Sequence, residues 1–349
     1  MGLTVAVTGP TGELGISVVE ALEREDAVDT VLGMARRRFD PESRGWHKTR
    51  YRRGDVLDRT AVHALVADAD VVVHLAFVVL GTHSQSARVN VAGCRSVFEA
   101  SVDAPRPRRL AYTSSVAAYG YHADTPVPIV ETAPARGSLE HGYSAQKAQC
   151  EQVLAAVTAG TQLEVYVLRP CVVAGPAATN IVRNLPWRLA AARLPAPLSV
   201  PLAGLVRLGR TAGRLPLPLP AVRPLLPDPG VALQLVHHDD VARAVVAAVL
   251  GAGPPGAYNL AGPGTVTIAD YARAVGALPV PVPHAAVSLG SRLLARVPGV
   301  PAWAQWLHTL REPMIMDTHR ARELLGWAPR YTAAQTLAAT VSACRADKT

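Results

Sequence analysis

The sequence predicts an α/β fold with a doubly wound parallel sheet and a smaller, mainly C-terminal lobe. Apolar strand-like runs alternate with helical patterns along the first half of the chain, which is a βαβ rhythm. The runs are nearly continuous in Val, Leu and Ala, as is typical of parallel strands covered by helices on both faces. With 349 residues, 49% of them hydrophobic, the chain is long enough for one large α/β domain or two intimately joined ones.

The expected elements follow this rhythm in order. From about Pro176 to Gly230 the chain becomes rich in Pro, Leu and Arg and loses strand signals. We therefore expect one lobe over residues 1–175, to which 236–261 return, and a second lobe over 176–235 and 262–349. Strands are expected over residues 3–8, 28–35, 70–76, 109–114, 165–169 and 257–260, and helices over 15–24, 240–250, 268–275 and 287–297.

Composition disfavours several classes of function. The net charge is +8, but the longest basic run is residues 36–38, so a nucleic-acid partner is not expected. The four cysteines, at 94, 150, 171 and 344, are widely spaced and form no Cys-x-x-Cys pair. This pattern favours reduced thiols in a cytoplasmic protein over disulfides or a metal site.

Membrane insertion is not expected either. The chain enters an apolar strand pattern directly after Met1, without the basic region and cleavage site of a signal peptide. The apolar stretches 195–206 and 215–226 are short and broken by proline, so neither predicts a transmembrane segment. Peripheral contact through the Pro/Leu/Arg-rich region or residues 287–307 is a weaker idea, because basic amphipathic segments can lie on anionic surfaces.

Residues 5–15 read VAVTGPTGELG, a buried strand followed by three glycines and a helix. Gly9 permits a tight turn, Gly12 lets the backbone approach a pyrophosphate, and Gly15 allows close packing of helix on strand. The start of the helix offers free N–H groups to an anion. The pattern predicts a Rossmann-type dinucleotide site whose phosphate contacts come from Gly9, Thr11, Gly12, Glu13, Leu14 and Gly15.

The second expected strand ends at Ala35 and Arg36. At this position an acid holds the ribose 2′-OH of NAD, whereas an arginine accommodates the 2′-phosphate of NADP. No carboxylate occupies the strand end. Arg36 therefore favours NADP(H), with NAD(H) as the alternative, and a solvated basic loop is the competing interpretation.

A series of further motifs resembles the extended short-chain dehydrogenase/reductase superfamily, in its NAD-dependent epimerase/dehydratase group. The motifs occur in the family's order along almost the whole chain. After the TGxxGxxG turn, Gly54, Asp55, Val56 and Asp58 resemble its GDxxD element, and His74, Leu75 and Ala76 its HLA strand end, with Asn90 as its helix asparagine. Ser114, Ser115, Tyr119 and Gly120 resemble its SSxxxYG stretch, Tyr143 and Lys147 its YxxxK, and Arg169, Pro170, Gly175 and Pro176 its RPxxxxGP segment. Val236, His237, Asp239, Asp240 and Val241 resemble its VHxDDV element, and Leu325, Gly326, Trp327 and Pro329 its LGWxP.

The resemblance implies further cofactor contacts. It brings Asp55 to the adenine and Lys147 to the nicotinamide ribose. It also implies that Val56, Leu75, Ala76, Asn90 and Pro170 lie along the cofactor, together with Val172 within the RPxxxxGP segment.

The YxxxK motif predicts a proton-transfer pair. If Tyr143 and Lys147 lie on one helix, their spacing brings them to the same face, one turn apart. A nearby ammonium would lower the pKa of the tyrosine, and Ser115 would hold the substrate oxygen. An exposed helix turn is the alternative, but lysine is rare: Lys48 and Lys348 are the only others.

Two further groups are interpreted as structural. His237 and His238, followed by two aspartates, could suggest a metal site, but we expect Asp240 to cap the following helix and His237 to pack at the strand end. Cys171, flanked by apolar residues, is expected in the core and not as a catalytic acid or base. No metal is expected.

Departures from the family pattern bear on the substrate. The acid pair of sugar dehydratases is replaced by Val116 and Ala117, and two positions typical of nucleotide-sugar binding hold Val172 and Leu233. The apolar 176–230 region also favours a hydrophobic small molecule. We expect a ketone reductase or alcohol dehydrogenase acting on such a substrate in a substrate-binding second lobe, with a homodimer as one conceivable assembly. The alternatives are an NDP-sugar epimerase and a non-catalytic NADP-binding sensor or scaffold.

Overall fold

The core of the protein is a seven-stranded parallel sheet. The computed structural model describes residues 2–79, 86–179, 225–283, 285 and 312–346. The strand order is β10-β6-β5-β4-β1-β2-β3, and every neighbouring pair is parallel. The order reverses between β1 and β4, as in a Rossmann-type sheet. The strands are β1 (Leu3–Thr8), β2 (Val28–Ala35), β3 (Thr49–Arg53), β4 (Val71–His74), β5 (Arg109–Thr113), β6 (Glu164–Pro170) and β10 (Gly256–Leu260).

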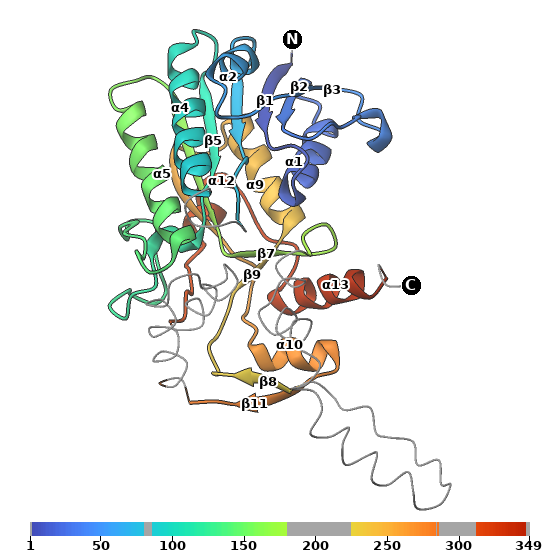
Figure 1. Cartoon of the computed structure of the whole chain (residues 1–349), viewed down its shortest axis with the longest axis vertical. Helices are drawn as coiled ribbons and strands as arrows, with labels where there is room; N and C mark the ends of the chain where they lie inside the picture. The colour runs from blue at the N-terminus through green and yellow to red at the C-terminus, as the bar shows by residue number, and fades with distance from the viewer. Residues whose placement is uncertain (1, 80–85, 180–224, 284, 286–311, 347–349) are drawn as a thin grey trace, which may run out of the picture.

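Helices cover both faces of this sheet (Figure 1). On one face lie α2 (Arg59–Val66), α4 (Gly93–Asp103) and α5 (Gly142–Thr158), and on the other lie α1 (Glu13–Glu23) and α9 (His238–Leu250). Alternate residues of one strand therefore face two different cores. In β1, Val5 and Val7 pack with α1 and α9, whereas Ala6 packs with α2 and α4.

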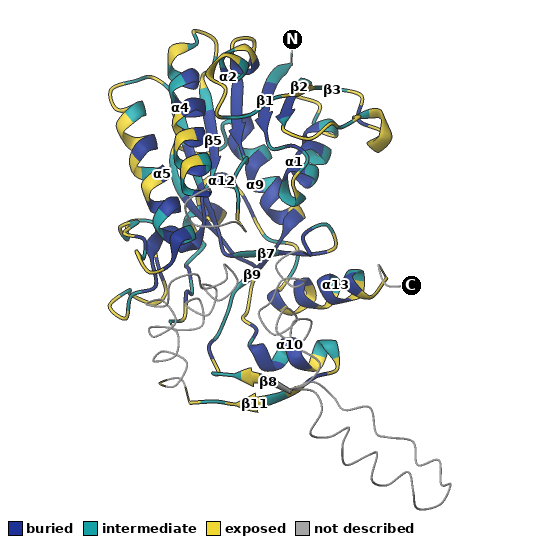
Figure 2. Cartoon of the chain, in the orientation of Figure 1, coloured by how far each residue is buried: buried dark blue, intermediate teal, exposed yellow. Residues whose placement is uncertain are grey.

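Burial explains why the central strands read as continuous apolar runs. All four residues of β4 are buried, and β1 is buried from Val5 to Thr8 (Figure 2). The edge strand β3 differs, since its sequence is TRYRR and only Thr49 is buried. Strand β3 is therefore absent from the strands expected from the sequence, because an exposed edge strand needs no apolar run.

A smaller layer lies beyond the carboxyl ends of the strands (Figure 1). Helices α10 (Ile268–Val275) and α13 (Ala333–Ala346) share an apolar core that includes Leu235 and Leu337. This layer also contains two parallel strand pairs. They are β7 (Val172–Ala174) with β9 (Leu235–His237), and β8 (Leu225–Asp228) with β11 (Leu278–Pro281). The division of the chain into two lobes stays a prediction.

Short elements complete the described chain. They are the 3₁₀ helices η1 (Glu42–Arg44) and η3 (Val116–Tyr119), the π-helix η2 (Arg88–Ala92), and α12 (His319–Leu325) against β10. The expected helix 287–297, the peripheral-contact segment 287–307 and most of the apolar 176–230 region lie outside the described residues. Within the described ranges, none of the helices combines the length and the apolar character needed to cross a bilayer.

Candidate functional site

The turn between β1 and α1 is as tight and as closely packed as was expected from its first and third glycines, Gly9 and Gly15. Gly9 has a φ of 76°, and a Cβ there would lie 2.9 Å from the Cα of Ala76. A Cβ on Gly15 would lie 2.1 Å from the carbonyl oxygen of Gly9, so only glycine lets α1 pack this closely on the turn. Both glycines thus serve the protein's own packing.

Gly12, the second glycine, is not crowded by the protein. Among the described residues, the only close contact of a Cβ at Gly12 would be the Gly9 carbonyl oxygen, at an ordinary 3.5 Å. No described side chain caps α1, which begins with Glu13 and Leu14 directly after Thr11 and Gly12. The exposed backbone over this helix start fits the close approach of a pyrophosphate.

Exposed arginines surround the end of β2. Residues 36–38 follow the strand, and Arg53 lies opposite Ala35 at the end of β3. The Nε atom of Arg53 donates a hydrogen bond to the carbonyl oxygen of Arg36 at 3.0 Å. In the described part of the chain these arginines form no ion pair. The strand end therefore carries positive charge that none of the described carboxylates pairs with.

Asp55 and Val56 follow β3 and turn toward α4. The Asp55 carboxylate accepts a hydrogen bond from the backbone N–H of Leu57 at 3.0 Å. Val56 packs so tightly on Gly93 that a Cβ there would lie 2.5 Å from its Cγ2 atom. The loop is thus held at the same sheet edge as the glycine turn.

Leu75 and Ala76 follow β4 on the other side of this turn. The N–H of Leu75 donates to the carbonyl oxygen of Thr8 at 3.2 Å, and the N–H of Ala76 donates to the Thr8 hydroxyl at 3.4 Å. These bonds bring Ala76 against Gly9 at the reversal of strand order. Ligands of doubly wound sheets bind at this point.

Asn90 uses its amide within the protein. Its oxygen accepts from the N–H of Val78 at 2.7 Å, and its NH₂ donates to the Val78 carbonyl oxygen at 3.0 Å and to Gln146 at 2.7 Å. The side chain is 2% exposed. Direct contact with a cofactor stays a prediction, whereas these bonds join the segment after β4 to α5.

Ser115 and Tyr143 meet through their side chains. Tyr143 lies in the first turn of α5, which His141 caps by accepting a hydrogen bond from the N–H of Ser144 at 3.2 Å. Ser115 begins η3, where its hydroxyl accepts from the N–H of Ala117 at 3.2 Å. Burial raises the pKa of Tyr143, and its hydrogen bond with Ser115 opposes this shift.

Lys147 lies one turn further along α5, as the i, i+4 spacing predicts. It is 3% exposed, and its Nζ donates to the carbonyl oxygen of Thr113 at 2.9 Å. The Nζ atom also lies 3.7 Å from the ring centroid of Phe77 and 5.9 Å from that of Tyr143. Burial lowers the pKa of Lys147 to about 8.

The structure does not agree with the expectation that Lys147 lowers the pKa of Tyr143. The tyrosine pKa is raised, because burial disfavours the phenolate more than its surroundings favour it. At neutral pH Tyr143 is therefore a phenol that can donate a proton.

Pro170 and Val172 lie on either side of Cys171, where β6 passes into β7. The N–H of Cys171 donates to the carbonyl oxygen of Leu260 at 2.9 Å, so β10 fixes this junction. The Cys171 side chain is 6% exposed, and burial raises its pKa. Cys171 is thus a neutral core thiol, in agreement with its structural interpretation.

A buried polar network supports the strand ends beside Ser115. Arg169 pairs with Glu151 at 2.6 Å and donates to the Tyr119 hydroxyl at 2.9 Å. Ser114 donates to Glu151 at 2.5 Å, and Tyr119 donates to Asn259 at 2.7 Å. Burial lowers the pKa of Arg169, but the ion pair with Glu151 more than offsets this and keeps it raised. Glu151 and Asn259 were not recognised in the sequence, although Glu151 lies one helical turn after Lys147.

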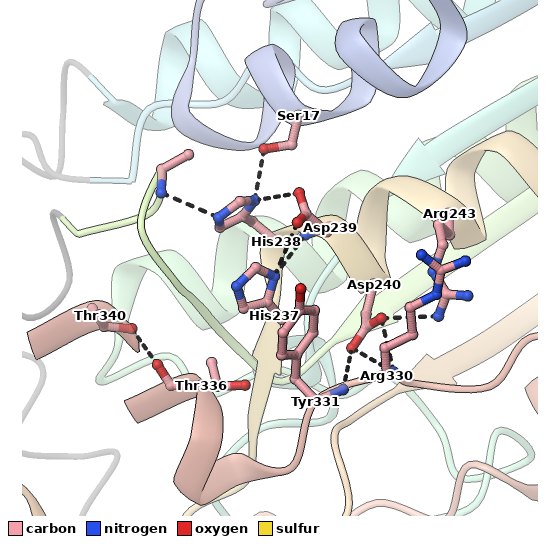
Figure 3. Close-up of polar contacts among 11 residues, drawn as sticks. Ser17, His237, His238, Asp239, Asp240, Arg243, Arg330, Tyr331, Thr336 and Thr340 are labelled. Carbon is pink, nitrogen blue, oxygen red and sulfur yellow. Dashed lines mark hydrogen bonds and ion pairs between the residues drawn. The ribbon is translucent and has the colours of Figure 1, made fainter. Parts of the chain in front are cut away.

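The two adjacent histidines belong to a hydrogen-bonded cluster (Figure 3). The Nδ1 atom of His238 lies 2.8 Å from the Ser17 hydroxyl and 2.9 Å from a carboxylate oxygen of Asp239. Its Nε2 atom accepts from the N–H of Ala177 at 3.1 Å. His237, His238 and Asp239 have ligand atoms within 4.8 Å of one another, but the His238 nitrogens are already used.

The expected helix cap at Asp240 is wrong. The side chain of His237 caps α9 by accepting from the N–H of Asp239 at 3.2 Å. Asp240 is fully buried and instead accepts from the N–H groups of Arg330 and Tyr331 (Figure 3). An aspartate at this helix position can bond back to the N-cap N–H, as Asp270 does in α10, but Asp240 instead satisfies a chain segment ninety residues away.

Comparison with known proteins agrees with this architecture. A UDP-glucose 4-epimerase from Thermotoga maritima, solved with UDP-glucose, superimposes with a TM-score of 0.69 at 19% identity, over 99% of this chain and 100% of that chain. A short-chain dehydrogenase/reductase superfamily protein from Agrobacterium tumefaciens, with bound NAD, gives 0.69 at 18% identity, over 99% and 98%. This chain therefore shares its fold with these two structures.

The model of the NAD dependent epimerase/dehydratase family matches residues 5–261, and the chain belongs to this family. An uncharacterized protein of Mycobacterium tuberculosis is 26% identical over 270 residues, which are 76% of this chain and 63% of that protein. The match thus spans less than two thirds of that relative.

Proposed function

We propose that this protein is an NAD(P)-dependent ketone reductase or alcohol dehydrogenase that acts on a hydrophobic small molecule. The observation that carries the proposal is the meeting of Ser115, Tyr143 and Lys147 beside the glycine turn. The bare backbone over Gly12 fits a dinucleotide, because a Cβ there would make only one ordinary contact, 3.5 Å from the Gly9 carbonyl oxygen, among the described residues. When bound, the nicotinamide supplies or accepts the hydride.

The protein's own residues would handle the proton. Tyr143, kept as a phenol by burial, would donate its proton to the substrate oxygen during reduction, and Ser115 would hold that oxygen by a hydrogen bond. Lys147 would bind the nicotinamide ribose with the N–H donors that Thr113 does not use. Oxidation of an alcohol would reverse the proton transfer.

We favour NADP(H) over NAD(H). Arg36 at the end of β2 and the guanidinium of Arg53 beside it offer two charged donors at the strand end where a 2′-phosphate would lie. The similar Agrobacterium protein was solved with NAD, so the preference depends on these two residues. Arg36→Ala should weaken NADPH binding more than NADH binding, and Arg50→Ala, on the same edge of the sheet, is a matched control.

The substrate is proposed to be apolar. Val116 and Ala117 are buried at the positions where sugar dehydratases have carboxylates, and Val172 and Leu233 pack on an apolar core. Leu139, four residues before Tyr143, is 94% exposed, and Val79, after β4, is 47% exposed. Exposed apolar side chains in the segments before α5 and after β4 favour a ketone on an apolar skeleton over a sugar.

The test is a cofactor titration followed by a substrate screen. Fluorescence titrations with NADPH and NADH identify the better cofactor, and turnover is then measured with hydrophobic ketones and with nucleotide sugars. Reduction of one or more ketones supports the proposal. Turnover of nucleotide sugars alone would identify an epimerase instead, and nucleotide binding without any turnover would favour a sensor or scaffold.

A further inference from the structure

Phe77 contacts both members of the proton-transfer pair. It follows the HLA strand end after β4, and its ring centroid lies 3.7 Å from the Nζ atom of Lys147. The same ring meets the ring of Tyr143 edge to face, with centroids 5.6 Å apart and an interplanar angle of 87°. No function was expected for Phe77 from the sequence, although it directly follows the HLA motif.

The ammonium group of Lys147 is surrounded by protein groups in place of water. Besides Phe77, the ring centroid of Tyr112 lies 5.1 Å from its Nζ atom, and Cys94, Cys150 and Glu151 favour its charged form. Lys147 is 3% exposed and takes part in no ion pair among the described residues. The carbonyl oxygen of Thr113 satisfies one of its three N–H donors. The negative face of an aromatic ring attracts a cation, and this attraction is stronger where water is excluded. The ring of Phe77 therefore supplies a second stabilising contact.

We propose that Phe77 is a positioning residue of the Tyr143–Lys147 pair, whose ring face keeps the Lys147 ammonium charged and directed between Thr113 and Tyr143. The inference rests on the proposed function for its catalytic meaning, but the contact itself can be measured without any substrate. Edge-to-face packing also restricts the Tyr143 ring, because Phe77 contacts both the lysine and the tyrosine ring.

The small number of lysines makes a direct measurement practical. The chain has Lys48, Lys147 and Lys348, so protein labelled with ¹³C at the lysine ε-carbon should give three signals. Lys147→Arg assigns the Lys147 signal, and its titration is then followed by NMR. The Lys48 ammonium, which donates to the carbonyl oxygen of Glu25 at 2.8 Å, is the internal control.

Phe77→Leu removes the ring face and keeps an apolar side chain, so the titration midpoint of Lys147 should fall by about one pH unit. Phe77→Tyr, which keeps the ring face, should leave the midpoint near its original value. Phe77→Met repeats the test if the leucine variant folds poorly. An unchanged midpoint would overturn the proposal, and so would a rise, since a rise would mean that the ring merely excludes water.

Kinetics separate this inference from the proposed function. If ketone reduction is found, the alkaline limb of the pH profile of kcat/KM should move to lower pH in Phe77→Leu by the same amount, and Phe77→Tyr should restore it. A limb that stays in place while the NMR midpoint moves would overturn the positioning role. Absence of ketone turnover in the unaltered protein would defeat the proposed function, whereas the NMR midpoint would still decide whether Phe77 stabilises the ammonium.

Discussion

The Tyr143–Lys147 pair and the His237–His238–Asp239 cluster are both groups of titratable side chains at the start of a helix. They differ in how completely the protein satisfies them. Both ring nitrogens of His238 have protein partners, whereas the ammonium of Lys147 has one hydrogen-bond acceptor among the described residues and otherwise faces aromatic rings, with Phe77 the nearest of them. Spare hydrogen-bonding capacity in a buried group is costly for folding and is useful for binding a ligand.

The comparison therefore separates a site that binds and reacts from a cluster that holds segments together. The His238 side chain joins α1, α9 and the segment at Ala177. The Tyr143–Lys147 pair lies beside the open glycine turn. Changes in the Tyr143–Lys147 pair should therefore affect turnover, and changes in or around the histidine cluster should affect stability.

The largest expected effect is on turnover in Tyr143→Phe. Removing the phenolic proton should lower kcat by about 10²- to 10⁴-fold, while nucleotide binding and the melting temperature stay close to their original values. The measurement is steady-state kinetics with a ketone identified in the screen. Tyr331→Phe is the matched control, because Tyr331 stacks on His237 at 3.9 Å in the structural cluster. Full activity in Tyr143→Phe would contradict the assignment of the proton donor.

Asp240→Asn should have its main effect on stability. Asp240 is fully buried and accepts from two backbone N–H groups and from Arg243, so replacing one oxygen by NH₂ should lower the free energy of unfolding by about 3 kcal/mol. Urea denaturation measures this change. Asp239→Asn, whose side chain is 50% exposed, should cost less. Equal losses in the two variants would mean that burial does not distinguish these carboxylates.

The buried side chain of His74 should make the protein less stable as the pH falls. Burial lowers its pKa from 6.5 to about 3, so the folded protein cannot take up the proton that the unfolded chain accepts. As pH falls from 6.5 toward 3, this group should reduce the free energy of unfolding by about 1.4 kcal/mol per pH unit. Denaturation of the original protein and His74→Asn at several pH values isolates the effect. Identical slopes would show that His74 does not contribute.

The smallest expected effect is the response to zinc. Because both nitrogens of His238 are already hydrogen-bonded, Zn²⁺ should leave the melting temperature essentially unchanged. Thermal denaturation over a zinc titration is the measurement. A saturable rise that disappears in His238→Gln would instead identify a metal site and would remove the contrast between the two regions.

Much of the fold could be predicted because its signals are local. The bounds of β1 and β2 agree with the expected strands 3–8 and 28–35, and α10 agrees with 268–275. The glycine turn was predictable because a positive φ at Gly9 is a property of one residue and its neighbours. The i, i+4 spacing of Tyr143 and Lys147 was likewise enough to bring them to one face of α5.

Other features could not be predicted from local pattern. Edge strand β3 has no apolar run, and Asp240 finds its partners at residues 330 and 331 and not at the start of its own helix. The aspartate pattern was compatible with a cap, and only the distant segment shows which donors the carboxylate satisfies. The contacts of Glu151 and Asn259 in the Arg169 network could not be predicted for the same reason, because their partners are distant in the sequence.

The sequence by itself determined the buried parallel strands, the glycine turn and the family's motifs, because these depend on residue type and spacing. Tertiary structure alone decided that Phe77 lies over Lys147, that Tyr143 is a phenol and not an activated phenolate, and that the His238 nitrogens are occupied. The reason is physical. Desolvation and hydrogen-bond saturation depend on which distant segments exclude water from a group, and local spacing does not carry that information.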